Sequence, residues 1–143
     1  MPLLFMNATS SADDVAQFLT KVRPVVYQDI VINGTTVKEG VKDCEIRYPI
    51  LKNILDQYKR PFTVLDIGAS EGNFSIRIAR EYDASCVMIE GDKTLLLPSI
   101  CALNNQQKNL IVLEKFITAE DLKELSACEH FDVVLAFNVV HQM

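Results

Sequence analysis

The sequence predicts an α/β fold in which helices flank a parallel sheet. From residue 61 onward, short apolar runs alternate with segments of helical spacing, which is typical of parallel strands joined by right-handed crossovers. The first run, Thr63–Ile67, leads through a glycine-containing turn, Gly68–Gly72, into a helical segment. This order of strand, glycine turn and helix is typical of Rossmann-like sheets that bind nucleotides. We therefore expect a Rossmann-like sheet, preceded by a helix and a β-hairpin.

Residues 1–60 are expected to form a helix, a hairpin and a second helix that pack on this sheet. The first helix is predicted to begin after Ser11 and to end before Pro24. Asn33-Gly34 is a strong two-residue turn signal and predicts a hairpin of residues 25–32 and 35–37. The second helix is predicted over residues 44–58, because its apolar positions recur at helical spacing: Ile46, Ile50, Leu51, Ile54, Leu55 and Tyr58.

Residues 61–143 are expected to form four strands and three helices. The apolar runs predict strands at residues 63–67, 86–90, 110–114 and 131–137, and the segments between them predict helices at residues 73–81, 94–105 and 119–127. Ligands of such sheets bind beyond the carboxyl ends of the strands. The expected strand ends are Asp66, Glu90, Glu114 and Phe137.

The turn after the first of these strands has the composition of a ligand site. We expect it to gather unpaired backbone N–H groups, which hold small anionic or nucleotide-like ligands. Gly68 and Gly72 lack a Cβ, so the backbone can approach a ligand closely. Glu90 follows about 20 residues after the turn, where a carboxylate accepts hydrogen bonds from ribose hydroxyls.

At three places the chain resembles the class I S-adenosylmethionine-dependent methyltransferases. The family's first motif matches residues 64–72, its second acid matches Glu90, and its fourth motif matches residues 131–138, with Ser70 in place of a frequent middle glycine. The resemblance implies S-adenosylmethionine as cofactor: Asp66 would hold its ammonium, Glu90 its ribose, and the segment around Phe116 its adenine. It assigns cofactor contacts to Asp66, Gly68, Ala69, Ser70, Gly72, Phe74, Glu90, Gly91, Phe116 and Asn138. Phe116 has an equally good alternative as a core residue.

Other interpretations of the turn remain. Residues 68–72 also fit G-x-S-x-G, the nucleophile elbow of serine hydrolases, with Ser70, Asp132 and His141 as a formal triad. That interpretation leaves Asp66 and Glu90 without a role. The G-x-G-x-x-G motif of dinucleotide-binding sites is absent, which argues against a dinucleotide ligand. A strand-to-helix turn that binds no ligand would leave the positions of Asp66 and Glu90 unexplained.

The resemblance does not identify a catalytic residue, because the family has none that is universal. The sequence Asn138-Val139-Val140-His141 lacks the prolines and the aromatic residue found in methyltransferases of nucleic-acid bases and protein amines. It therefore resembles enzymes that act on small molecules, and we expect a small-molecule or sugar-like acceptor. His141 is a candidate general base or a plain helix residue. The alternative from another class is a non-catalytic module that binds a cofactor or a partner.

Domains of this class usually have seven strands, and the sequence ends after the predicted fourth strand. We therefore expect a domain truncated there, whose last strand lies beside the first strand of the sheet. The outer edge of that strand would carry unpaired backbone groups. We expect the chain to self-associate through this edge, unless another chain or the N-terminal hairpin covers it.

Composition excludes several classes of protein. The chain has 143 residues, 49% of them hydrophobic, which indicates one ordered domain. A net charge of −5 without a basic cluster argues against nucleic acid as a partner. No apolar stretch is long enough for a membrane span, and the four cysteines show neither metal-ligand nor disulfide spacing. We expect a cytoplasmic protein without a metal site.

Overall fold

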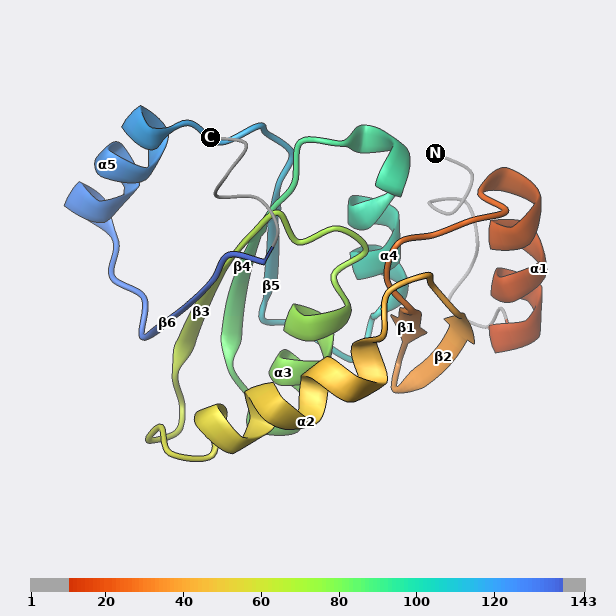
Figure 1. The fold of residues 1–143 in the computed structure, drawn as a ribbon, viewed down its shortest axis with the longest axis horizontal. Helices are drawn as coiled ribbons and strands as arrows, with labels where there is room; N and C mark the ends of the chain where they lie inside the picture. The colour runs from red at the N-terminus through yellow and green to blue at the C-terminus, as the bar shows by residue number, and fades with distance from the viewer. Residues whose placement is uncertain (1–10, 138–143) are drawn as a thin grey trace.

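The sheet of the computed structural model, which describes residues 11–137, has four parallel strands. These are β3 (Thr63–Ile67), β4 (Ser85–Ile89), β5 (Leu110–Leu113) and β6 (Val133–Leu135), in the spatial order β5-β4-β3-β6. The crossover helices are α3 (Asn73–Tyr82), α4 (Leu97–Leu103) and α5 (Ala119–Cys128). The expected Rossmann-like α/β class is confirmed, and β6 lies beside β3 as predicted (Figure 1).

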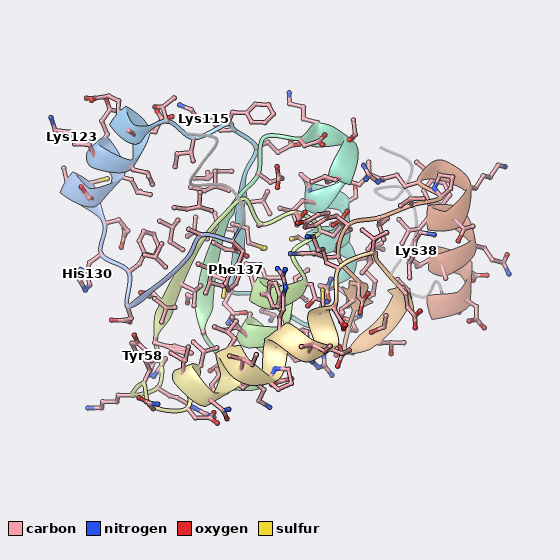
Figure 2. All side chains as sticks on the ribbon, viewed as in Figure 1. Lys38, Tyr58, Lys115, Lys123, His130 and Phe137 are labelled. Carbon is pink, nitrogen blue, oxygen red and sulfur yellow. The ribbon has the colours of Figure 1, made fainter. Side chains whose placement is uncertain are left out.

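Helices cover the two faces of the sheet unequally. One face carries α2 (Cys44–Leu55), α3 and α4, whereas α5 lies on the other (Figure 1). On the first face, buried side chains of β3, β4 and β6 join Tyr48 of α2 and Phe74 of α3 in one apolar cluster. Phe74 stacks on Tyr48 with 6.4 Å between ring centroids, and Phe137 packs on Phe74 at 5.3 Å (Figure 2). α2 therefore lies over the part of the sheet that contains β3 and β6.

The N-terminal segment forms a helix and a hairpin at the opposite side of the molecule from β6. In α1 (Ala12–Val22), Ser11 accepts from the N–H of Asp14 in a capping box. The antiparallel hairpin consists of β1 (Ile30–Ile32) and β2 (Thr35–Lys38). It packs with α1 against Ile76 of α3 and Ile100 of α4. The N-terminal hairpin was one of the two expected covers for the outer edge of β6. The structure shows that it does not lie on that edge.

Four elements differ in extent from the sequence-based expectation by more than one residue. The helix expected over residues 94–105 is divided into a 3-10 turn, η2 (Lys93–Leu95), and α4, because Leu96 has a left-handed φ of 60° between them. β1 begins at Ile30 rather than at residue 25, since residues 27 and 28 donate their N–H groups to Glu71 instead of to a strand. α2 ends at Leu55, three residues early, and β6 is shorter than expected.

None of the helices within residues 11–137 combines the length and the apolar character that crossing a membrane would require.

Candidate functional site

The turn between β3 and α3 has three left-handed residues. Gly68, Ser70 and Gly72 have φ values of 72°, 60° and 75°. Glycine adopts this conformation freely, whereas a serine there costs on the order of 1–2 kcal/mol. The N–H of Ser70 donates to Glu90 Oε1 at 2.8 Å, and this bond offsets part of the cost. The serine in place of the middle glycine thus keeps a glycine-like backbone conformation.

The backbone N–H groups of this turn are already bonded within the protein. Gly68 and Ala69 both donate to the carbonyl of Ile89, at 2.8 and 3.1 Å. Gly72 donates to the carbonyl of Ala69, and Asn73 donates to the side-chain oxygen of Gln28 at 3.0 Å. The expectation of unpaired N–H groups at these positions is therefore wrong. A buried turn must satisfy its donors, and here neighbouring loops supply the acceptors.

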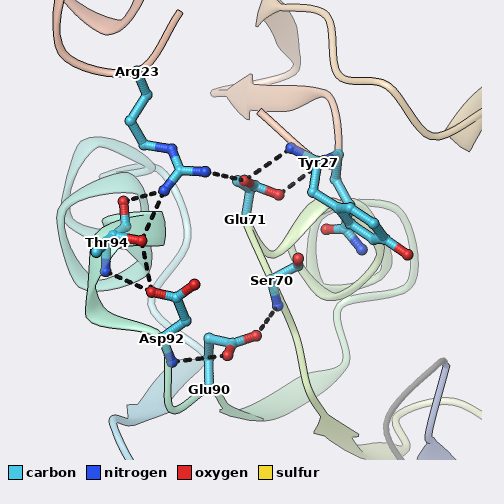
Figure 3. A network of polar contacts seen from close by, with 8 residues as sticks. Arg23, Tyr27, Ser70, Glu71, Glu90, Asp92 and Thr94 are labelled. Atoms are coloured by element: carbon cyan, nitrogen blue, oxygen red, sulfur yellow. Dashed lines mark hydrogen bonds and ion pairs between the residues drawn. The ribbon is translucent and has the colours of Figure 1, made fainter. Parts of the chain in front are cut away.

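Glu90 joins two loops at the carboxyl end of the sheet. Its Oε1 accepts from Ser70, and its Oε2 accepts from the N–H of Asp92 at 3.0 Å (Figure 3). A carboxylate offers about four acceptor positions, so about two remain for a ligand. Glu90 follows β4 and is only half-buried, so the structure leaves it in the position that the ribose assignment requires. The assignment itself stays a prediction.

Asp66 is a buried acid at the end of β3. Its side chain accepts from the hydroxyl of Ser75 at 2.6 Å and is almost completely shielded from solvent. The pKa of Asp66 is raised to about 6, mainly by burial; the Ser75 bond opposes this rise, and the nearby charge of Glu90 adds to it. Asp66 therefore takes up a proton just below neutral pH and would favour a cation beside it.

Two residues assigned to the cofactor lie on the core side of the turn. A Cβ on Gly72 would come within 2.8 Å of Leu97 Cδ1 and 3.1 Å of Ile76 Cδ1, so this close packing and the positive φ together favour glycine there. Phe74 is buried in the apolar cluster between Tyr48 and Phe137. Packing and backbone conformation explain both residues. Ala69 is also buried, beside Leu97.

Phe116 lies directly on Gly91. A Cβ built on Gly91 would overlap the ring of Phe116, so the ring occupies the place of a side chain at position 91. The ring is nevertheless 75% exposed, which excludes the alternative role of Phe116 as a core residue. An exposed aromatic face beside Glu90 suits the stacking of a planar base.

Sequence reasoning missed a polar network that ties the N-terminal segment to the turn. Glu71 is fully buried and accepts from the N–H groups of Tyr27 and Gln28, at 3.2 and 2.8 Å (Figure 3). Arg23 lies 3.9 Å from the Glu71 carboxylate and also donates to the carbonyl and the hydroxyl of Thr94. Glu71 was visible as an acid within the turn, but no sequence signal linked it to residues more than 40 positions earlier.

Asn73, the first residue of α3, extends this network. Its side-chain amide donates to the carbonyl of Asp29 at 2.9 Å. Its buried Oδ1 has no hydrogen-bond partner within the described part of the chain. Buried acceptors are ordinarily paired, so this oxygen is an exception within an otherwise well-bonded network.

The serine hydrolase interpretation is wrong. Asp132 precedes β6 and accepts from the N–H of Thr63 at 2.9 Å, so it lies at the amino end of the sheet. Ser70 follows the carboxyl end of β3, and a five-residue strand separates the two ends by roughly 15 Å. His141 and Asn138 lie outside the described residues. His130 lies in the loop before β6, away from the turn (Figure 2).

Comparison with solved structures identifies the fold. The bifunctional kinase-methyltransferase WbdD matches with a TM-score of 0.61 and 22% identity, over 89% of this chain and 29% of that one. The N-terminal domain of EvdMO1, crystallised in the presence of SAH and D-fucose, matches with a TM-score of 0.64 and 17% identity. That match covers 90% of this chain and 54% of the other, so the chain spans about half of the EvdMO1 domain and less than a third of WbdD. No family model and no curated protein matches the sequence.

These similarities show that the chain has the Rossmann-like fold of WbdD and of the N-terminal domain of EvdMO1. At identities below 25%, they show the fold alone.

Proposed function

We propose that this chain is the cofactor-binding part of an S-adenosylmethionine-dependent methyltransferase. The observation that carries the proposal is the position of Glu90, which is fixed by Ser70 of the glycine turn and remains open to a ligand at the tip of β4. In open α/β sheets this tip lies beside the crevice in which nucleotide ligands bind. The ribose diol of the cofactor would donate to the remaining acceptor positions of Glu90.

The groups around Glu90 suit the other parts of this cofactor. Phe116 presents an exposed ring for the adenine. Asp66, whose ionised form is disfavoured by burial, would be stabilised by a nearby ammonium group. The chain thus offers an aromatic face, a ribose acceptor and an acid in the order in which the cofactor carries adenine, ribose and amino acid.

The acceptor in this proposal is a small molecule or a sugar. Support comes from EvdMO1, whose N-terminal domain was crystallised with SAH and D-fucose. Methyl transfer is an in-line displacement in which positioning supplies much of the rate, so no dedicated base is required of the described residues.

We also propose a cytoplasmic location for the protein. Its support is that the four cysteines are free thiols: Cys44, Cys86, Cys101 and Cys128.

Calorimetry with S-adenosylhomocysteine, S-adenosylmethionine and NAD tests the cofactor. We expect the first two to bind and NAD to bind more weakly. Glu90→Gln keeps the size of the side chain but removes its charge, and it should weaken S-adenosylhomocysteine by about 1–3 kcal/mol, or roughly 5- to 150-fold. Glu114→Gln is the matched control, because Glu114 is an exposed acid directly after the neighbouring strand β5.

Tighter binding of NAD than of S-adenosylhomocysteine would contradict the proposal. Equal affinity of the Glu90 and Glu114 variants would show that the ribose is held elsewhere. Transfer of a labelled methyl group to a panel of sugars then tests the acceptor class separately from cofactor binding.

A further inference from the structure

Two loops at the carboxyl end of the sheet are joined at two separate points. The first is the glycine turn, and the second, residues 90–96, leads from β4 to α4. We call this second segment the β4 loop. Glu90 joins the loops at one point, because its two oxygens accept the N–H groups of Ser70 and Asp92. Arg23, from the N-terminal segment, joins them at the other point (Figure 3).

Arg23 reaches each loop with a different nitrogen. Its Nη2 lies 3.9 Å from Oε2 of Glu71 in the glycine turn. Its Nη1 donates to the hydroxyl of Thr94 in the β4 loop at 3.0 Å, and also to the carbonyl of Thr94. The planar guanidinium holds the two nitrogens in a fixed geometry, so it sets the separation of the two loops. The single ammonium of a lysine cannot hold both partners in this way.

Hydrogen bonds connect this contact to Glu90. The hydroxyl and the N–H of Thr94 both donate to Oδ1 of Asp92, at 2.6 and 3.0 Å. The N–H of Asp92 donates to one oxygen of Glu90, and the N–H of Ser70 donates to the other. Glu71 directly follows Ser70 in the sequence. The result is a closed ring of residues: Arg23, Thr94, Asp92, Glu90, Ser70 and Glu71 (Figure 3).

Helix α1 anchors Arg23 over the helices that follow the two loops. Val15 and Leu19 of α1 pack in one apolar cluster with Ile76 of α3 and Ile100 of α4. Arg23 is the C-cap of α1, and its N–H donates to the carbonyl of Leu19 at 2.7 Å. Since α3 follows the glycine turn and α4 follows the β4 loop, both helices fix the place from which Arg23 extends.

The segment that follows Arg23 is bound to the glycine turn as well. The N–H of Gln28 donates to Glu71 at 2.8 Å, and its side-chain oxygen accepts from the N–H of Asn73 at 3.0 Å. Gly72, the N-cap of α3, has no side chain, so Gln28 supplies the acceptor that a capping residue ordinarily provides. Arg23 is therefore held in place from both directions along the chain.

We propose that Arg23 is a positioning residue for the cofactor, an inference that rests on the proposed function. Arg23 holds the two loops at the separation at which Glu90 accepts from both. These two bonds orient the Glu90 carboxylate, so that its remaining acceptor positions face the ribose. When the loops separate, Glu90 keeps only one of its two N–H donors and loses this orientation. The N-terminal segment thereby becomes part of the cofactor site without touching the cofactor.

Hydrogen exchange of single backbone amides, measured by NMR on the 143-residue chain without ligand, tests the geometric part. Arg23→Lys should raise the exchange rates of the Ser70 and Asp92 amides about 10-fold, because local opening of the loops exposes them. The amide of Cys86, which lies within β4 and donates to the carbonyl of residue 109, should keep its rate. A purely stabilising role of Arg23 would not single out the two amides that bond to Glu90.

Arg80→Lys is the matched control. Arg80 lies on α3 near the end remote from the glycine turn, is exposed, and donates to Gln106 at 2.9 Å. The substitution again replaces a guanidinium by an ammonium, but outside the ring. It should leave the exchange rates of the Ser70 and Asp92 amides unchanged.

Calorimetry with S-adenosylhomocysteine tests the link to the cofactor. Arg23→Lys should weaken binding about 10-fold, and Arg80→Lys should not. The loss caused by Glu90→Gln should be about 10-fold smaller in Arg23→Lys than in the parent chain, a coupling typical of residues in one network. Thr94→Val removes the hydroxyl of the ring at an exposed position, so it weakens binding in the same way at less cost to folding.

Unchanged exchange of the Ser70 and Asp92 amides in Arg23→Lys overturns the proposal, whether or not S-adenosylhomocysteine binds. Strictly additive losses of affinity in Arg23→Lys and Glu90→Gln also overturn it. A parent chain that does not bind S-adenosylhomocysteine contradicts the proposed function instead, and the exchange rates then decide by themselves whether Arg23 positions Glu90.

Discussion

At the scale of single residues, two acids beside the glycine turn lie in different environments. Asp66 is shielded from solvent, whereas Glu90 is half-buried and holds two backbone N–H groups. Two carboxylates at neighbouring strand ends can therefore take different roles, because burial disfavours the charge on one of them. The difference is measurable as a dependence of stability on pH.

Asp66→Asn should remove a pH-dependent loss of stability. Burial raises the folded-state pKa of Asp66 from 3.8 to about 6, so the native protein holds this proton more tightly than the unfolded chain does. The contribution of the Asp66 carboxyl to the free energy of unfolding is fully present below about pH 4 and is lost as the pH rises through about 6. Relative to the parent chain, Asp66→Asn should gain about 2 kcal/mol between pH 4.5 and 7.5.

Urea denaturation of both chains across this pH range measures the effect. Ser75→Ala serves as a second variant, because the Ser75 hydroxyl lowers the pKa of Asp66. Its stability should continue to fall at higher pH than that of the parent chain. A constant difference between Asp66→Asn and the parent from pH 4.5 to 7.5 would contradict the assignment.

Phe116→Ala should weaken binding of S-adenosylhomocysteine by about 1–3 kcal/mol, the range for stacking of one base on an aromatic ring. Folding should change little, because the ring is 75% exposed. Phe116→Trp should retain affinity, and since the chain contains no tryptophan, its fluorescence reports the ligand directly. Calorimetry on Phe116→Ala and fluorescence titration of Phe116→Trp check this. Unchanged affinity of Phe116→Ala would place the adenine elsewhere.

At the scale of elements, Arg23 joins three segments. It ends α1, approaches Glu71 of the turn, and donates to Thr94 of η2. Burial raises the pKa of Glu71, and the bonds from Tyr27 and Gln28 oppose this rise. The buried Glu71 carboxylate therefore depends on the few donors that surround it.

Arg23→Ala should destabilise the fold by about 1–3 kcal/mol, because it leaves a buried carboxylate with fewer partners. Glu71→Gln should recover part of this loss when it is added to Arg23→Ala, since it removes the unpaired charge. The free energies of unfolding of the two single variants and the double variant form a cycle, with an expected coupling of about 0.5–3 kcal/mol. Strictly additive effects would show that the two side chains act independently.

The sequence predicted elements better than it predicted contacts between them. Apolar runs located β3, β4 and β5 to within one residue, since buried parallel strands need such runs. The helix expected over residues 94–105 breaks at Leu96, and the sequence did not indicate this break, because the positive φ of a leucine is imposed by its surroundings. For the same reason, the sequence did not indicate that Glu71 bonds to the distant residues Tyr27 and Gln28.

In the candidate site, too, the positions of residues along the strands were predictable, whereas the contacts between loops were not. Asp66 and Glu90 lie at strand ends as predicted, because the length of each apolar run indicates where a buried strand ends. The contact of Phe116 with Gly91 could not be predicted, since it depends on how the loop after β5 folds back. Gly72 was assigned to a ligand, but the side chain that excludes a Cβ there is Leu97, 25 positions later.

At the scale of the whole molecule, the long-range hydrogen bonds of the hairpin set an order of events during synthesis. Asn104 accepts from the N–H of Asn33 at 2.9 Å and donates to the carbonyl of Val31 at 2.9 Å, across 71 and 73 positions of the sequence. A ribosome that adds 5–20 residues per second needs roughly 4–15 s to make that stretch. A lone two-stranded hairpin is marginal in water, so β1 and β2 wait unsupported through this interval. The hairpin is therefore made early relative to the sheet, yet it becomes ordered only after α4 has been made.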